Sequence, residues 1–185
     1  MTIKYFTHRE DWRHWLKENF DTTDEIWLEY PKKTSGKPRI EYNNAVEEAL
    51  CFGWIDSTVK SLNKNTTIQR FTKRRKNSTF SQANKERLKW LFENDMLHHS
   101  IKAQVHGIIN EEFIFPEDII ATLKEDNKVW DNYQKLSDSY KRIRVAYIES
   151  ARKRPDEFNK RLNNFRAKTR DKKLIKGFGG INKYY

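Results

Sequence analysis

The stretch from residue 43 to residue 76 constrains the fold of this chain more than any other. Apolar residues recur at the spacing of one helix face from Ala45 to Leu50, whereas Glu47 and Glu48 fall on the opposite face. This pattern predicts a helix that turns its apolar side to the core. Gly53 supplies the permissive backbone that ends the helix.

Two strands are predicted directly after this helix. Residues 54–60 alternate between two faces, and residues 66–73 alternate again and are rich in Thr, Ile and Phe. A polar turn at 63–65 separates them, which indicates an antiparallel hairpin. Alternation places one set of side chains on a common face: Trp54, Asp56, Thr58 and Lys60.

The residues before this unit predict the rest of a small sheet. Thr7 and Glu10 have the spacing of a capping box and predict the start of a helix. Residues 25–30 alternate as a half-buried strand, and residues 39–42 predict a short strand that pairs with it. The predicted order is therefore helix, two strands, helix, two strands, with helices covering one face of the sheet.

Helical patterns dominate the second half of the chain. Apolar and aromatic residues align on one face after Ser137, and Pro155 starts a further helix, so the two helices are predicted to form a hairpin. The fold class is α+β: a small, mainly antiparallel sheet packed by helices, then a helical C-terminal region. We expect an α+β domain over 1–110, a helical region over 111–175 and a flexible tail over 176–185.

Four segments resemble the YdeI/OmpD-associated family of small bacterial proteins, often labelled bacteriocin-protection proteins. They are EEALCFGWIDS (47–57), RFTKRRKNSTFSQANKERL (70–88), WLKENFDTTDEIWLEYPKKTSGKPRIEY (15–42) and LSDSYKRIRVAYIESARKR (136–154). Lys73 and Arg74 stand where the family pattern has a Thr-Pro-Arg type sequence, and Phe80 stands in place of Trp. The resemblance implies a cytoplasmic protein linked to envelope stress or peptide-toxin resistance. It implies no reaction and no catalytic residues.

Composition is typical of a folded protein without membrane insertion. No apolar run is long enough to cross a bilayer, and the N-terminus lacks the apolar core of a signal peptide, so a cytoplasmic location is expected. The single cysteine, Cys51, lies among apolar residues and is interpreted as a small buried side chain. His98, His99 and His106 are assigned to a helix surface, and neither a metal ion nor a cofactor is expected.

The net charge of +11 is concentrated in two basic blocks. Residues 57–85 hold eight Lys and Arg and no acid, and residues 158–185 hold nine against Asp171 alone. Such blocks predict either an anionic partner, with nucleic acid as one alternative, or a solvated surface. Four cationic side chains at the end of the hairpin form the candidate anion or nucleic-acid site: Lys73, Arg74, Arg75 and Lys76.

The polar face of the hairpin is the candidate ligand site. An aromatic ring, an acid and several donors on one face could bind an anionic or zwitterionic small molecule, and Asp56 could equally form a surface ion pair with Lys60 or Arg70. The candidate ligand-binding residues are Trp54, Asp56, Thr58, Lys60 and Arg70.

Three functions compete at this point. The first is a non-enzymatic binding or adaptor protein with a small-molecule or protein partner, and the C-terminal helix hairpin leaves a homodimer open. The second is nucleic-acid binding through the two basic blocks, with interleaved aromatic rings for stacking. The third is an enzyme in which Asp56 acts as general base. Because no phosphate loop, dinucleotide fingerprint or nucleophile elbow is present, a binding protein ranks above an enzyme.

Overall fold

The protein comprises two compact units. The computed structural model describes residues 1–75 and 78–176; one unit is formed by Met1–Thr79 and Leu91–His106, the other by Phe80–Trp90 and Gly107–Tyr185. The first unit carries the sheet and the second is helical, which confirms the predicted α+β class. None of the described helices is long and apolar enough to span a membrane.

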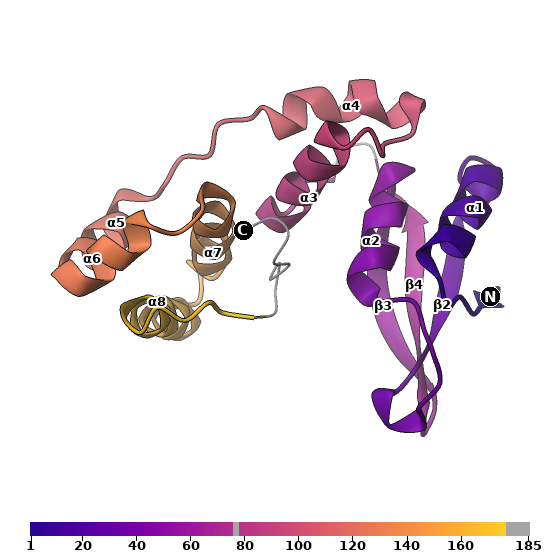
Figure 1. Ribbon diagram of the computed structural model, residues 1–185, viewed down its shortest axis with the longest axis horizontal. Helices are drawn as coiled ribbons and strands as arrows, with labels where there is room; N and C mark the ends of the chain where they lie inside the picture. Colours follow the sequence, from indigo (N-terminus) through magenta and orange to yellow (C-terminus); the bar gives the residue numbers. More distant parts are fainter. Residues whose placement is uncertain (76–77, 177–185) are drawn as a thin grey trace. The chain divides into compact units, whose positions relative to one another are not determined.

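The first unit is built on a four-stranded sheet with the order β1-β2-β4-β3 (Figure 1). Its strands are β1 (Ile3–Lys4), β2 (Glu25–Pro31), β3 (Trp54–Asn63) and β4 (Thr66–Lys73). β1 pairs with β2 in parallel and the other pairs are antiparallel, so the sheet is mainly antiparallel as predicted. The strand predicted at 39–42 is wrong, because α2 already begins at Tyr42, and the parallel strand β1 was not predicted.

Helices α1 (Arg9–Asn19) and α2 (Tyr42–Cys51) pack on one face of this sheet; the single turn η1 (Lys33–Ser35) lies between β2 and α2. Trp12 of α1 is fully buried and meets the ring of Phe71 on β4 at 5.5 Å between centroids. Its indole Nε1 donates to the carbonyl of Ala45 at 3.0 Å, which joins α1 to α2. The core of the unit therefore lies between these two helices and the sheet.

Two expectations about these helices are wrong. The N-cap of α1 is His8 without a side-chain hydrogen bond, so the Thr7–Glu10 capping box does not form. Glu47 and Glu48 are not on a solvent-facing side, because they are 0% and 1% exposed. Cations of α1 pair with these two carboxylates. The hydrophobic pattern of one helix cannot reveal partners that lie on another helix.

Arg9 and Arg13 of α1 hold the buried carboxylate of Glu48. Arg9 Nε donates to Oε1 at 2.8 Å and Arg13 Nη1 donates to Oε2 at 2.6 Å. Arg9 Nη2 lies 3.4 Å from Glu47 Oε2, and Arg13 Nη2 donates to the carbonyl of Met96 at 2.7 Å. Hydrogen bonds to Glu48 and the carboxylate charges outweigh burial and raise the pKa of both guanidinium groups. These four side chains form the buried ion cluster.

A β-bulge divides strand β3. Asp56 lies opposite Phe71 and Val59 lies opposite Gln69, so three steps on β3 match two on β4. The alternation of side chains between the two faces of the sheet is therefore interrupted at the bulge. The side chain of Gln69 hydrogen-bonds to the backbone of the bulge: its Nε2 donates to the Ser57 carbonyl at 3.3 Å.

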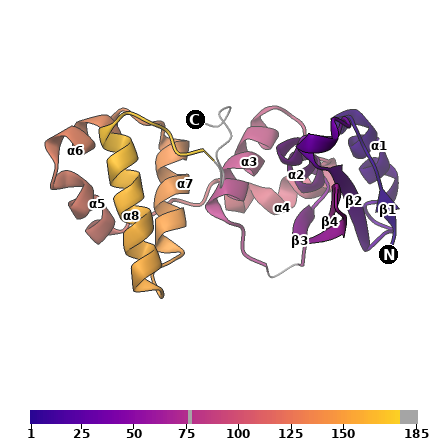
Figure 2. The ribbon, with the colours of Figure 1, turned by 90° about the horizontal axis from the view of Figure 1, so that it is seen from below.

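The second unit is a group of helices around an aromatic and aliphatic core (Figure 2). Ser81 Oγ accepts from the N–H of Asn84 at the start of α3. Arg142 ties that start to α7 through two hydrogen bonds to Glu86, of 2.6 and 2.8 Å. The unit contains α5 (Glu117–Lys124), α6 (Asn127–Gln134), α7 (Asp138–Glu149) and α8 (Pro155–Arg170), whereas α3 (Gln82–Glu93) and α4 (His99–Ile109) each contribute residues to both units.

Replacement of Glu48 by Gln is expected to lower the free energy of unfolding of the first unit by about 2 kcal/mol, because it leaves two guanidinium groups facing a neutral amide. This loss is smaller than the ~3–5 kcal/mol expected when a fully buried ion pair is broken, because Arg9 and Arg13 keep 23% and 38% of their side-chain surface exposed. Urea unfolding measures the change. Glu18→Gln, at an exposed i,i+4 pair with His14, is the control, and equal losses in both variants would contradict the assignment.

His98 is expected to make the first unit less stable in acid. Burial is the main cause of its lowered pKa, with the neighbouring charges of His99 and Arg13 contributing. The unfolded chain therefore binds a proton at higher pH than the folded one. The contribution of neutral His98 to stability is fully present above the ordinary histidine pKa of about 6.5. It is lost as the pH falls toward the lower pKa of His98 in the folded protein.

Thermal unfolding between about pH 8 and about pH 5 measures this contribution. The loss of Tm should be smaller in His98→Gln than in the native protein. His14→Gln, whose ring is exposed, should behave like the native protein. If both variants lose Tm to the same extent as the native protein, His98 is not responsible.

Candidate functional site

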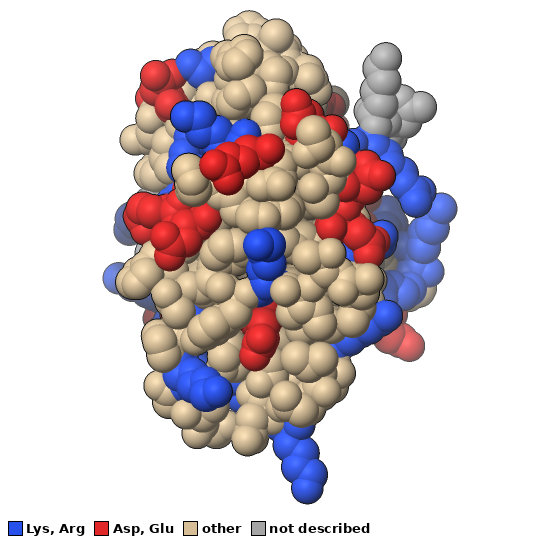
Figure 3. Space-filling view, turned by 90° about the vertical axis from the view of Figure 1, so that its right-hand side faces the viewer, with Lys and Arg blue, Asp and Glu red and all other residues tan. Residues whose placement is uncertain are grey.

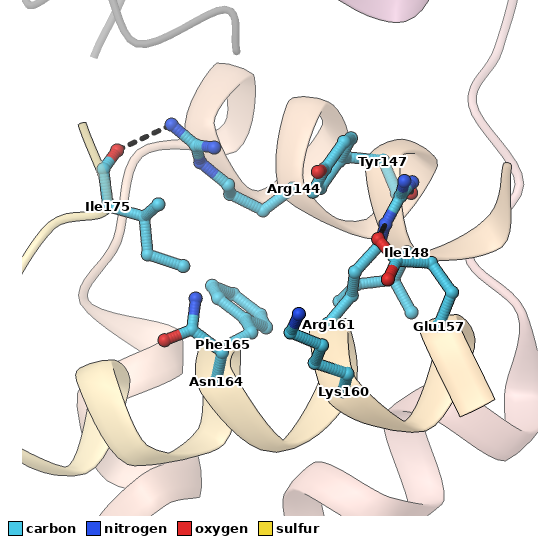
Figure 4. A pocket seen from close by; sticks show the side chains of 9 residues that line it. All are labelled: Arg144, Tyr147, Ile148, Glu157, Lys160, Arg161, Asn164, Phe165 and Ile175. Carbon is cyan, nitrogen blue, oxygen red and sulfur yellow. Dashed lines mark hydrogen bonds and ion pairs between the residues drawn. The ribbon is translucent and has the colours of Figure 1, made fainter. Parts of the chain in front are cut away.

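A pocket of about 230 Å³ opens in the helical unit between α7, α8 and the segment that follows α8 (Figure 4). It combines cationic side chains with an apolar lining. The residues that line it are Arg144, Tyr147, Ile148, Glu157, Lys160, Arg161, Asn164, Phe165 and Ile175.

The segment after α8 is tied back onto α7 beside the pocket. The N–H of Ile175 donates to the Tyr140 hydroxyl at 2.8 Å, and Arg144 Nη2 donates to the Ile175 carbonyl at 2.5 Å. Both the N–H and the carbonyl of Ile175 are thus hydrogen-bonded to side chains of α7. This arrangement holds the Ile175 side chain as one wall of the pocket (Figure 4).

Three cations face the pocket in different environments. Arg144 is only 2% exposed, and its guanidinium lies 5.2 Å from the centre of the Tyr140 ring. Arg161 stacks 3.8 Å from the centre of the Tyr147 ring and donates to Glu157 at 2.7 Å. Lys160 is exposed and makes no ion pair with any described residue. Arg144 and Arg161 are therefore held by neighbouring groups, whereas Lys160 is exposed to solvent.

Glu157 is the only carboxylate among the described residues that line the pocket. The hydrogen bond from Arg161 is the main cause of its lowered pKa, and the charges of Arg161 and Lys160 add to it. Glu157 therefore stays ionised at neutral pH and neutralises Arg161. The described lining residues thus comprise three cations, Arg144, Lys160 and Arg161, and one carboxylate.

The floor of the pocket is apolar. Ile148 and Phe165 are 1% exposed and belong to the core of the helical unit, and Ile175 packs against that core. Asn164 adds an amide at the rim (Figure 4). Such a lining can bind a molecule that has one anionic group and an apolar body.

The hairpin residues predicted as a ligand site do not share one face. Trp54 is fully buried and donates from Nε1 to the Phe20 carbonyl at 3.0 Å, and Asp56 lies on the same, helix-covered side. Thr58 lies in the bulge and is exposed. Ligand binding by these residues stays a prediction, but its premise of a common face is wrong.

Lys60 and Arg70 belong to the other face of the sheet. Lys60 Nζ lies 4.9 Å from the centre of the Trp27 ring, and Arg70 Nε donates to Glu25 at 2.8 Å. The pairs Trp27–Arg70 and Glu25–Thr72 set this face in the register of β2 and β4. The bulge explains the division, since it breaks the alternation on which the prediction depended.

The cations predicted to follow the hairpin are largely engaged within the protein. Lys73 Nζ donates to the Asp21 carbonyl at 2.7 Å and to Asp24 at 3.2 Å. Arg74 donates to the Thr79 carbonyl, and burial lowers its pKa. Arg75 is exposed, and Lys76 lies outside the described residues. Binding of an anion or nucleic acid here stays a prediction.

Acids from outside the two basic blocks pair with some of their cations. Arg70, Lys73 and Lys85 pair with Glu25, Asp24 and Glu111, and Arg166 and Arg170 pair with Glu125 and Asp126. Figure 3 shows a face on which acidic and basic side chains are interspersed. The charge of a sequence block is thus a poor guide to the potential at its surface.

Cys51 is 0% exposed, and burial raises the pKa of its thiol to about 12. This confirms its interpretation as a buried side chain, because a thiol in this state is not a nucleophile at neutral pH. Among the side chains of residues 1–75 and 78–176, no group of three or more His, Cys, Asp or Glu could hold a metal ion.

Sequence reasoning missed Arg144 and Tyr147 as functional candidates. Tyr147 falls on the apolar face of the helix predicted after Ser137, and Arg144 belongs to no recognised motif. Only the packing of α7 against α8 and the return of Ile175 bring them to one pocket. An arginine inside an otherwise apolar helix face was the available signal.

Two family models match the chain. Residues 4–104 match a domain of unknown function (DUF8412), and residues 112–174 match the family described as bacteriocin-protection, YdeI or OmpD-associated. Of the four segments that resemble the latter family, only 136–154 lies within its match. The pocket residues from Arg144 to Phe165 lie within it too. Comparison with curated proteins and with solved structures gives no match.

Replacement of Tyr140 by Phe is expected to loosen the segment that closes the pocket. It removes the acceptor of the Ile175 N–H, and an unsatisfied amide costs about 1 kcal/mol or more. Hydrogen exchange of the Ile175 amide should become several-fold faster. Tyr133→Phe, which removes the hydroxyl of another tyrosine of the same core, should leave that amide unchanged. Unchanged exchange in Tyr140→Phe would contradict the role of this bond.

Proposed function

Because the chain belongs to the family of the domain of unknown function DUF8412 and carries a C-terminal YdeI/OmpD-associated domain, we propose that it is a binding protein whose helical unit captures a small amphiphilic anion. The ligand's anionic group binds between Arg144 and Lys160, and its apolar body contacts Ile148, Phe165 and Ile175. The observation that carries the proposal is a nearly fully buried arginine in the wall of a pocket with an apolar floor.

The charge of Arg144 favours an anion because it acts in a desolvated environment. A guanidinium that is 2% exposed is screened weakly by water, so its interaction with a bound anion is stronger than at the surface. The planar guanidinium also presents donors that suit carboxylate and phosphate oxygens. Lys160 adds a solvent-exposed positive charge at the rim.

The volume limits the ligand to a small molecule. Pockets for drug-sized ligands measure roughly 300–1,000 Å³, and this one holds about 230 Å³. A single ring or short alkyl chain with one carboxylate, phosphate or sulfonate fits this description. The described lining residues bind and orient; the one carboxylate among them, Glu157, is occupied by Arg161.

The proposed binding role agrees with the family description of bacteriocin protection without assigning a reaction. We propose that ligand capture takes place in the cytoplasm and contributes to resistance against stress or peptide toxins. A nucleic-acid role is the competing hypothesis, and the same experiments distinguish the two.

The first test titrates the purified full-length protein with phenyl phosphate and follows amide chemical shifts by NMR. Saturable shifts are expected around Arg144, Asn164 and Phe165, whereas phenol and benzylamine should give none, because they lack the anionic group. If benzylamine binds as well as phenyl phosphate, the proposed site is wrong. Tighter binding of single-stranded DNA with a steep salt dependence would favour the nucleic-acid hypothesis instead.

A matched pair of lysine variants locates the site on α8. Lys160→Gln should weaken phenyl phosphate binding by about five-fold, the loss expected for one partly screened charge of about 1 kcal/mol. Lys168→Gln removes the same charge two turns along the helix, outside the pocket, and should have no effect. Equal weakening in both variants would show that binding reports overall charge and not the pocket.

A further inference from the structure

The hydroxyl of Tyr30 in the first unit is buried. The residue is 6% exposed, and its Oη has no partner within the described part of the chain. Leaving a buried polar group unsatisfied costs roughly 1–3 kcal/mol. A hydroxyl in this state is available to a ligand that reaches it.

Tyr30 shares the helix-covered face of the sheet with Gln69 and Asp56. The register sets Tyr30 opposite Thr67, Gln69 opposite Leu28, and Asp56 opposite Phe71, so the three side chains project from the same side of β2, β4 and β3. They lie where that face reaches α2, because the Tyr42 hydroxyl donates to Asp56 Oδ2 at 2.6 Å.

Asp56 is held in position and still has one free acceptor. Tyr42 and the buried Gln69, whose Nε2 lies at 3.3 Å, both donate to Oδ2. Oδ1 accepts no hydrogen bond from any residue that the structure describes. A carboxylate fixed through one oxygen and open at the other is pre-organised to receive a donor.

The local charge favours a cationic donor. The carboxylates of Asp56 and Glu41 raise the pKa of the Tyr30 hydroxyl, and the guanidinium of Arg39 lowers it. The guanidinium of Arg39 is already directed to the Pro31 carbonyl at 2.8 Å and lies 5.9 Å from the centre of the Tyr30 ring. Burial and the negative charge of Asp56 also raise the pKa of Tyr30, which therefore remains a neutral hydroxyl.

We infer that this cluster binds a primary ammonium group, which donates to Asp56 Oδ1 and to the Tyr30 hydroxyl. An ammonium has three donors and can satisfy both oxygens at once. The exposed side chains of Tyr42 and Val59, 46% and 58% accessible, provide apolar contact for the attached alkyl chain. The inference concerns the first unit alone and does not depend on the anion pocket of the second.

Titration of the full-length protein with n-butylamine, monitored through the Gln69 side-chain amide by NMR, tests the site. Saturable shifts are expected with butylammonium and none with butyrate or n-butanol. Asp56→Asn keeps the shape and should weaken binding by about ten-fold or more. Asp24→Asn, an exposed aspartate of the same unit, should bind like the native protein.

Tyr30→Phe separates a ligand role from a structural one. Because the hydroxyl makes no hydrogen bond to any residue that the structure describes, its removal should leave Tm unchanged or slightly higher while weakening butylammonium binding several-fold. Unweakened binding in Asp56→Asn or Tyr30→Phe would overturn the inference, as would an absence of saturable shifts. Lys160→Gln should bind butylammonium normally, so that failure of this site and of the anion pocket can be distinguished.

Discussion

The ion cluster beneath α1 is the interaction on which the first unit depends. Arg9 and Arg13 place two cations around the buried carboxylate of Glu48 and thereby join α1 to α2, the two helices that cover the sheet. Arg13 also reaches the Met96 carbonyl, so the segment after α3 is bonded to the same cluster. Buried charges tolerate few alternative arrangements, and this cluster therefore specifies which helix faces meet.

Much of the fold was predictable because it depends on local patterns. The hairpin, the helix that starts at Pro155 and the α+β class follow from alternation, turn residues and helical spacing. The burial of Glu47 and Glu48 was not predictable, since it requires partners almost forty residues away. The bulge after Asp56 was not predictable either: one unpaired residue moved Lys60 to the other face and divided the predicted site.

One candidate site is proposed to bind an anion and the other a cation, but the two are built in a similar way. Each places a charged group beside tyrosine rings and fixes it through neighbours that are already hydrogen-bonded: Arg144 through Ile175, and Asp56 through Tyr42 and Gln69. Neither site carries a sequence motif. The hairpin pattern identified Asp56 but not its partners, because Tyr30 and Tyr42 come from elements whose relative placement only the sheet and α2 define.

The chain passes between the two units three times: between Thr79 and Phe80, within α3 and within α4. A cut at any single position between 80 and 106 therefore removes residues that one unit needs, and neither unit corresponds to a continuous fragment. During synthesis the sheet is complete once β4 has left the ribosome, but its unit must wait for residues 91–106. Folding of the first unit is thus expected to finish only after part of the second has been made.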